Sequence, residues 1–346
     1  MEKTILVTGG GGFIGGHLVA RLRQMGHRRI RAVDIKPLEE WHQRFDDVEN
    51  VVADLRLRES CYRACEGVGD VYNLAADMGG MGFIETNKAA CMLSVLINTH
   101  LLLAARDQGV ERYFYSSTAC VYNTAKQNVP DAPPLKESDA YPALPEDGYG
   151  WEKLFSERMC RHFKEDFGLY VRVARFHNSY GPYGTWYGGR EKAPAALCRK
   201  VIEAQYDGTG AIEIWGDGTR TRSFMYIDDN IDGILKIMDS DIEEPINLGT
   251  SQRVTINGLV DLIEEIAGFQ VKRRYLLDKP QGVHGRNSDN TLILQRLGWE
   301  PRTPLREGLA VTYRWIEQEF LKMREQEVAR PAAARRPAVR STVRTS

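Results

Sequence analysis

The sequence lacks a long hydrophobic run and an excess of charge of either sign. No apolar stretch approaches the roughly 20 residues that a membrane-spanning helix needs, so we expect no membrane partner. The formal net charge of the chain is −1, and such a balance argues against nucleic acid as the main partner. A predicted strand starts within a few residues of Met1, and we expect no signal peptide before it.

Cysteines are few, and none of them falls in a CxxC pair. The six cysteines are scattered along the chain, at Cys61, Cys65, Cys91, Cys120, Cys160 and Cys198. Zinc sites and disulfide frameworks show closely or regularly spaced cysteines. We therefore expect reduced thiols, no bound metal and a cytoplasmic protein, because the cytosol keeps thiols reduced.

The first half of the chain alternates short apolar runs with helical stretches, a pattern typical of parallel βαβ units. Its 346 residues suggest about two domains. We predict an α/β fold with a Rossmann-type doubly wound parallel sheet and a smaller C-terminal α/β lobe. The strands of this sheet are expected at residues 4–8, 30–34, 51–53, 70–74, 112–116 and 170–175.

The second half of the chain has a different pattern. Residues 178–190 are rich in glycine, proline and aromatic residues, which predicts a loop. The segment 223–238 has the pattern of a strand followed by a helix, and we expect it to rejoin the first sheet. The last residues, 326–346, are rich in alanine, proline and arginine, which predicts a disordered basic tail.

A glycine-rich turn joins the first predicted strand to the first predicted helix. Gly9, Gly12 and Gly15 have the spacing GxxGxxG, with Phe13 and Ile14 between the last two. Glycines permit a tight turn and let backbone N–H groups approach a pyrophosphate at a helix N-terminus. The pattern therefore predicts a dinucleotide-binding turn.

A carboxylate follows at the spacing that a dinucleotide site requires. Asp34 ends the second predicted strand, 34 − 15 = 19 residues after the last glycine, where a carboxylate accepts hydrogen bonds from a ribose. A 2′-phosphate would be repelled there, which favours NAD, although Arg31 and Lys36 leave NADP open. Asp54 is predicted either to contact the adenine amine or to cap a helix.

Tyr149 and Lys153 are four residues apart on a predicted helix and therefore share a face, and we expect both to bind the cofactor as well as to act in catalysis. A nearby ammonium and the charge of a nicotinamide would lower the pKa of the tyrosine, so that it can take a proton from a sugar hydroxyl during hydride transfer. Thr118 follows the preceding strand and is the expected hydroxyl partner. If the chain stays extended, Cys120 faces the same pocket as Thr118; a buried structural thiol is an equally open interpretation.

These residues resemble the extended short-chain dehydrogenase/reductase family. The likeness covers roughly residues 1–325, through GGxGFIG, SSTACVY, YGWEK, RFHNSYGP and WGDGTRTRSFMYIDD. It implies an NAD-binding Rossmann domain formed by residues 1–177 with 223–248. It also implies a nucleotide-sugar-binding lobe formed by residues 178–222 with 249–325, and a homodimer built from helices.

Other strings resemble the GDP-mannose 3,5-epimerases more narrowly. They are GGMGFI from residue 79, STAC from 117, RFHN from 175, GGREKAP from 188 and GRNSDN from 285. The resemblance implies that Cys120 and Lys192 form an acid/base pair and that Thr118, Tyr149 and Lys153 serve oxidation and reduction. It also implies contacts to a GDP-sugar substrate, from Gly82, Asn178, Lys192, Lys200, Arg286 and Tyr313.

The chain departs from that pattern at a few positions. Thr118 stands where the family carries serine, Arg220 where it carries glutamine, and Asn123 where it carries proline. The hydroxyl of Thr118 is retained, whereas Arg220 leaves the detail of substrate binding open. Arg190 is either a phosphate ligand or a brace for its own loop.

Epimerisation at C3 and C5 of a sugar explains why a thiol and an amine accompany the redox residues. Oxidation of C4 to a ketone acidifies the neighbouring hydrogens, because the resulting carbanion is an enolate. An acid and a base are then needed on opposite faces of the ring, and thiols and amines both have tunable pKa values. We expect Cys120 to remove the proton and Lys192 to return one, with roles that can exchange between C3 and C5.

Other functions remain open on the sequence alone. A C4 epimerase of a nucleotide-sugar needs Thr118, Tyr149 and Lys153 but gives no reason for Cys120 or Lys192. A 3- or 3,5-epimerase of another GDP-sugar, such as GDP-heptose, fits the same residues. A non-catalytic NAD-sensing protein is disfavoured by the complete Thr–Tyr–Lys set.

Overall fold

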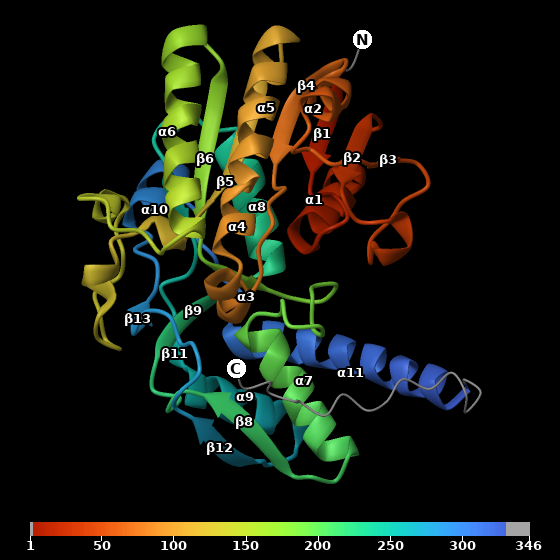
Figure 1. Ribbon diagram of the computed structural model, residues 1–346, viewed down its shortest axis with the longest axis vertical. Coiled ribbons are helices and arrows are strands. Elements are labelled where there is room, and N and C mark those ends of the chain that lie inside the picture. The colour runs from red at the N-terminus through yellow and green to blue at the C-terminus, as the bar shows by residue number, and fades with distance from the viewer. Residues whose placement is uncertain (1–2, 330–346) are drawn as a thin grey trace.

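The computed structural model describes residues 3–329, and a seven-stranded sheet is its largest element (Figure 1). Every neighbouring pair in the sheet is parallel, in the order β10-β6-β5-β4-β1-β2-β3. The strands are β1 (Thr4–Thr8), β2 (Ile30–Asp34), β3 (Glu49–Val52), β4 (Val68–Asn73), β5 (Arg112–Thr118), β6 (Tyr170–Phe176) and β10 (Ile246–Leu248). The order reverses beside β1, where doubly wound sheets bind ligands. This topology confirms the predicted fold class.

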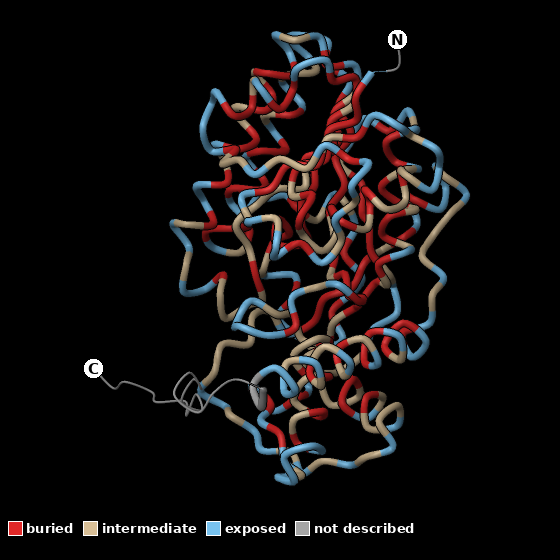
Figure 2. Tube along the Cα trace, turned by 90° about the vertical axis from the view of Figure 1, so that its right-hand side faces the viewer, coloured by how far each residue is buried: buried red, intermediate tan, exposed pale blue. Residues whose placement is uncertain are grey.

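Helices cover both faces of this sheet. One face carries α2 (Arg58–Cys65), α5 (Ser94–Asp107) and α6 (Tyr149–Phe167), and the other carries α1 (Phe13–Gln24) and α8 (Ile227–Met238). The strands are apolar on both sides because each side packs against helices. Figure 2 shows the buried residues running through the middle of this layered half of the molecule.

The segment Lys88–Asp107 is long and apolar enough to cross a membrane by length and composition, which corrects the expectation that no run approaches this length. It forms α4 (Lys88–Met92) and α5, and α5 packs between α2 and α6. Ile97, Leu101 and Leu102 are buried in the core under the sheet. The side of α5 that carries these residues therefore packs against the strands of the sheet.

The second lobe lies below the sheet in Figure 1. It contains β7 (Asn178–Tyr180), β9 (Thr221–Tyr226), β11 (Arg253–Thr255) and β13 (Gly285–Arg286) in one sheet, and β8 (Ala211–Trp215) with β12 (Lys272–Leu276) in another. Its helices are α7 (Ala193–Tyr206), α9 (Ile256–Ala267) and α11 (Leu305–Ala329), which enclose a separate core, while α10 (Thr291–Leu297) packs beside β10. The division of the chain into two domains stays a prediction.

Two expectations about the second half were wrong in part. Residues 178–190 begin with β7 instead of being loop throughout, and β9 joins the smaller sheet while only α8 and β10 rejoin the first. The reason is that β7 continues the chain one residue beyond β6 and pairs with β9, in the register Asn178 to Phe224. Residues 326–329, the first of the predicted tail, belong instead to α11, which runs to Ala329. The rest of the predicted tail, residues 330–346, lies outside the described part.

Candidate active site

The turn between β1 and α1 is too tight for a side chain at two of its glycines. Gly9 has a φ of +71°, which favours glycine, and a Cβ on Gly15 would lie 2.0 Å from the Gly9 carbonyl oxygen. The Gly12 N–H donates to that same oxygen at 2.9 Å. Helix α1 begins directly afterwards with Phe13 and Ile14, so the unpartnered amides of its first turn are available to a pyrophosphate.

Asp34 is held beside this turn by two backbone amides. Its Oδ2 accepts from the Gly11 N–H at 3.1 Å, and its Oδ1 accepts from the Lys36 N–H at 3.0 Å. Arg31, one of the two cations that left NADP open, donates instead to Glu49 Oε2 at 2.8 Å and to the Ala64 carbonyl at 2.7 Å. The carboxylate is thus placed as a ribose ligand without a cation from Arg31 to accept a 2′-phosphate.

Asp54 does not cap α2, whose N-cap is Leu57 without a side-chain hydrogen bond. Its two carboxylate oxygens accept from the Arg56 guanidinium, at 2.7 to 3.1 Å. This hydrogen bonding lowers the pKa of Asp54. The capping alternative is therefore wrong, and the adenine contact stays a prediction.

The residues predicted for oxidation and reduction lie together where β5 ends and α6 begins. Tyr149 is the first residue of α6, and Lys153 Nζ lies 5.7 Å from the centre of its ring. The ammonium also donates to the Ser116 carbonyl at 3.0 Å. Thr118 ends β5, and its hydroxyl acts on Tyr149 by lowering the pKa of that phenol. All three side chains are buried, so they face a site from which the protein excludes water.

Burial has a larger effect on the pKa values here than the neighbouring charges have. It raises the pKa of Tyr149 well above its usual value, with Cys120 and Glu152 adding to the rise and the Thr118 hydrogen bond opposing it. It also lowers the pKa of Lys153. The expectation that Lys153 lowers the tyrosine pKa is therefore not met by the chain alone. The positive nicotinamide of bound NAD would supply the missing stabilisation of a phenolate.

Cys120 lies beside Thr118 for a different reason from the one expected. The chain does not stay extended after β5, because residues Ala119–Val121 form a 3-10 turn. The Cys120 N–H donates to Thr118 Oγ1 at 3.2 Å, which holds the two residues together. Cys120 packs in one buried cluster with Tyr149. The hydrogen bond from the Cys120 N–H to the Thr118 side chain thus keeps the two residues together, as strand alternation was expected to do.

The Cys120 thiol is surrounded by charged groups. Arg286 Nη1 lies 3.6 Å from Cys120 Sγ, and Arg286 Nε donates to Gln127 Oε1 at 2.7 Å. The same guanidinium pairs with the carboxylate of Glu146. Burial raises the pKa of Cys120 to about 11, and Glu146 adds to this rise while Arg286 opposes it. Arg286 therefore lies at the thiol, and its predicted contact with the substrate stays a prediction.

Lys192 reaches the same site from the second lobe. It is the residue immediately before α7, whose N-terminus contains Pro194. Burial lowers the pKa of Lys192, and the negative charge of an ionised Cys120 would raise it. The two groups are thus close enough to interact, although they are far apart in the sequence. The structure brings together all five predicted catalytic residues.

A clamp between two loops positions Lys192. Arg190 Nη1 donates to Asp77 Oδ1 at 2.6 Å, and its guanidinium lies 3.8 Å from the centre of the Phe83 ring. The Gly80 N–H donates to the Arg190 carbonyl at 3.0 Å. Arg190 therefore braces its loop against the segment that leads into α3 (Met81–Thr86), one of the two roles left open.

The predicted substrate contacts are only partly gathered. A Cβ on Gly82 would lie 3.1 Å from the Trp215 ring, Asn178 donates to the Ser223 carbonyl at 3.3 Å, and Lys200 donates to the Glu213 carbonyl at 2.6 Å. Burial lowers the pKa of Lys200. Tyr313 is buried in the core of the second lobe, with its hydroxyl on Gln205 at 3.4 Å. The structure does not place Tyr313 in the site, so that prediction is corrected.

Two charged residues near Cys120 were missed. Arg222 on β9 donates to the carbonyls of Gln281 and Val283, and burial lowers its pKa to about 10, with Arg286 adding to the fall. Glu146 was not singled out at all. Arg220 and Arg222 alternate in the TRTRS motif, and alternate strand residues share a face. Because Arg220 was already a candidate for substrate binding, this spacing could have identified Arg222. Nothing local distinguishes Glu146 from a surface acid.

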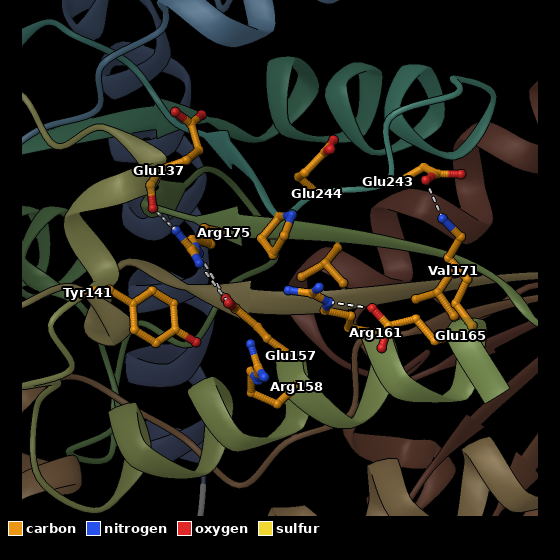
Figure 3. A pocket seen from close by; sticks show the side chains of 13 residues that line it. Glu137, Tyr141, Glu157, Arg158, Arg161, Glu165, Val171, Arg175, Glu243 and Glu244 are labelled. Carbon is orange, nitrogen blue, oxygen red and sulfur yellow. Dashed lines mark hydrogen bonds and ion pairs between the residues drawn. The ribbon is translucent and has the colours of Figure 1, made fainter.

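A cavity lined by α6, β6 and residues 243–245 is a separate feature (Figure 3). Its lining contains none of the five predicted catalytic residues. Its charges are largely paired with one another: Arg175 with Glu157, Arg161 with Glu165, and Lys164 with Glu243. It therefore offers few free charges to a ligand.

Comparison with known proteins places the chain in a family. The sequence model of the NAD dependent epimerase/dehydratase family matches residues 5–249. This chain belongs to that family. GDP-mannose 3,5-epimerase of Arabidopsis thaliana is 46% identical over 92% of the chain and 83% of its own length. GDP-mannose 3,5-epimerase 1 of Oryza sativa subsp. japonica is 46% identical over 94% and 84%.

Solved structures of similar proteins share the fold of this epimerase/dehydratase family member. UDP-glucose 4-epimerase of Thermotoga maritima, solved with UDP-glucose, has a TM-score of 0.82 at 27% identity, over 92% of this chain and 99% of its own. MoeE5, solved with UDP-glucose and NAD, has a TM-score of 0.74 at 28% identity, over 92% and 99%. With the glycine cradle and Asp34 in place, the chain is an NAD-dependent enzyme.

Proposed function

We propose that this enzyme catalyses the 3,5-epimerisation of GDP-mannose, giving GDP-L-galactose, GDP-L-gulose or both. The observation that carries the proposal is that Lys192 interacts electrostatically with Cys120, which packs beside Thr118 and Tyr149. A C4 epimerase uses the last two residues but has no need of the first two. Identity of 46% to GDP-mannose 3,5-epimerases over most of the chain supports the same substrate.

The redox residues act at C4 of the sugar. Thr118 and Tyr149 bind the C4 hydroxyl, and Tyr149 accepts its proton as a ketone forms. Bound NAD supplies the hydride acceptor at this carbon and later the hydride donor. Lys153 holds the tyrosine in place from the next helical turn and keeps its ammonium near the ring. Because hydride leaves and returns, the overall reaction is redox-neutral.

The acid/base pair acts at the carbons next to the ketone. Burial raises the pKa of Cys120 to about 11, which favours a neutral thiol, and it lowers the pKa of Lys192, which shifts that group toward the neutral amine a base needs. Lys192 is then the group that accepts a proton from carbon, and Cys120 the group that donates one. This order is the reverse of the one expected from the sequence.

Deuterium uptake from heavy water tests both the function and the order of proton transfer. The wild-type enzyme with GDP-mannose is expected to incorporate deuterium at C3 and C5, followed by NMR. Lys192→Met is expected to abolish uptake. Cys120→Ala is expected to take up deuterium without inversion, because Lys192 still removes the proton and returns a deuteron to the same face.

Each other result has a definite meaning. Uptake lost in Cys120→Ala and kept in Lys192→Met would assign the base to Cys120. A change at C4 without deuterium uptake at C3 or C5 would replace the proposal with a C4 epimerase. Binding of NAD without turnover of any GDP-sugar would indicate a sensor.

The pH dependence of turnover follows from the same two shifts. If Lys192 is the base, kcat/KM rises as pH passes its lowered pKa, because the neutral amine is needed. The rate falls only as pH nears about 11, the pKa of Cys120, because the neutral thiol is needed. A rate that is greatest in acid and declines through neutral pH would contradict this assignment.

We also propose that the enzyme is a homodimer in the cytoplasm. Leu93 and Leu96 next to and in α5, and Trp151 and Phe155 on α6, are exposed apolar side chains on neighbouring helices. A second copy covering them would account for the part of Lys88–Asp107 that the core does not bury. Phe155→Lys is expected to give a monomer by light scattering, and Phe167→Lys, at the other end of α6, to remain dimeric. The six buried cysteines, all free, are consistent with a reducing compartment.

A further inference from the structure

The carboxylate of Glu146 is built into the wall of the site at Cys120. Glu146 lies in the loop before α6, and its N–H donates to the Cys120 carbonyl at 2.9 Å. A Cβ on Gly150 would lie 2.4 Å from that same carbonyl oxygen, so the start of α6 packs tightly against it. The Glu146 side chain is 11% exposed. Backbone contacts thus fix where this carboxylate sits relative to the sulfur.

The cation of Arg286 is shared between Glu146 and Cys120. Its side chain is 6% exposed, it pairs with the Glu146 carboxylate, and its Nη1 lies 3.6 Å from Cys120 Sγ. Gln127 fixes the guanidinium from a third side, through Nε at 2.7 Å. A buried cation beside a sulfur favours the thiolate, and a buried carboxylate beside it favours the thiol. The two charges therefore act on Cys120 in opposite directions.

Other charged groups face the same sulfur. The charges of Arg222 on β9 and of Lys192 just before α7 also interact with Cys120, and Tyr149 packs in the same buried cluster. The cationic groups all favour the thiolate. Glu146 offsets them, by pairing with Arg286 and by placing a negative charge near the sulfur, which raises the pKa of Cys120.

We propose that Glu146 is a positioning residue that keeps Cys120 a neutral thiol, and so a proton donor, in the resting enzyme. Its part in epimerisation rests on the proposed function. Without Glu146, Arg286 would act on the sulfur with its full charge. The resulting thiolate would be a nucleophile and easily alkylated, and it would have no proton to give to the sugar carbon.

The ionisation of Cys120 is measurable without any substrate. Iodoacetamide reacts with the thiolate, so its rate at the Cys120 peptide of the NAD-loaded enzyme, followed by mass spectrometry against pH, reports the thiolate fraction. Glu146→Gln is expected to raise this rate at pH 8 about tenfold, since a fall of one pKa unit gives about ten times more thiolate. In turnover, the decline of the rate at high pH is expected to move to lower pH.

A neighbouring residue provides a matched control. Asp147→Asn also removes one carboxylate, but Asp147 is exposed and pairs with Lys88 at 2.7 Å, so the wild-type rate is expected. Arg286→Met removes the cation and is expected to slow alkylation below the wild-type rate. This second variant decides the question if Glu146→Gln does not fold, as judged by circular dichroism.

Three results would overturn the inference. They are equal alkylation profiles for the wild type and Glu146→Gln, an equal rise in Asp147→Asn, and an Arg286→Met rate that is not slower. None of these measurements uses GDP-mannose. An enzyme with no epimerase activity would therefore defeat the proposed function and leave the thiol result standing, whereas an unchanged thiol profile in an active epimerase would defeat this inference alone.

Discussion

The cofactor turn, which is the glycine turn at residues 9–15 together with Asp34, differs from the acid/base site around Cys120 in the atoms that it offers to a ligand. The cofactor turn presents backbone amides, shaped by glycines that have no room for a side chain, and one carboxylate, Asp34. The acid/base site presents side chains, a thiol, an amine and guanidinium groups, from the turn after β5, the residue before α7, and strands β9 and β13. The first comes from one β-α-β stretch, and the second forms only when two lobes meet.

This difference decides how each region responds to change. A backbone site fails sterically, when an added atom has nowhere to go. A side-chain site fails chemically, when a charge or proton is lost while the fold stays intact. Variants in the first region are therefore expected to lose the cofactor, and variants in the second to keep it and lose turnover.

The largest effect is expected from Gly15→Ala. The new Cβ would lie 2.0 Å from the Gly9 carbonyl oxygen, which the turn cannot accommodate without moving. The purified protein is expected to contain no NAD, measured by release and chromatography. Gly16→Ala is the control, because its Cβ would meet only the Gln43 side chain, at 3.2 Å. A Gly15→Ala protein that keeps a full complement of NAD would contradict the claim that this turn has no room for a side chain.

The next effect concerns chemistry without loss of cofactor. Tyr149→Phe removes the hydroxyl that exchanges a proton with the sugar, and kcat is expected to fall about 10²- to 10⁴-fold. The NAD content is expected to stay at the wild-type level. Tyr170→Phe removes a hydroxyl that donates to the Ser240 carbonyl instead and should leave kcat unchanged. If Tyr149→Phe lost NAD as well, the two regions would not be separable.

A smaller effect is expected at the carboxylate of the cofactor region. Asp34→Asn weakens hydrogen bonds to a charged acceptor, each of which contributes about 1.5–3 kcal/mol, and affinity for NAD is expected to fall about tenfold by calorimetry. Discrimination against NADP should fall with it. Asp54→Asn is the comparison, because Arg56 already occupies that carboxylate. Equal losses in both variants would show that Asp54 is a cofactor ligand of similar weight.

The smallest effect is expected at the loop clamp. The Arg190–Asp77 ion pair is about half exposed, and exposed pairs contribute about 0–1 kcal/mol. Arg190→Gln is expected to lower kcat/KM for GDP-mannose by no more than about fivefold and to leave the melting temperature unchanged. Arg274→Gln, on the outer edge strand β12, should change neither. A loss of a hundredfold would instead make Arg190 a direct substrate ligand.

The sequence predicted the first sheet well because its signals are local. Strands buried on both faces are short apolar runs, and each of the six predicted strands appears with ends within two residues of those expected. The prediction failed at β9, which is also largely buried but pairs with β7, β11 and β13. Pairing depends on which partner lies alongside, and the apolar pattern of a strand does not specify its partner.

The glycine turn, Asp34 and the Tyr149–Lys153 pair could be named from the sequence alone, since a turn of fixed geometry and one helical turn set their spacing. The tertiary structure decided the rest. It buried Tyr113 and Tyr115 in the core under the first sheet and Tyr313 in the core of the second lobe. It also joined Glu146 and Arg286, which are 140 positions apart, in one ion pair beside the Cys120 thiol. The physical reason is that burial and charge act through space, whereas a motif records only distance along the chain.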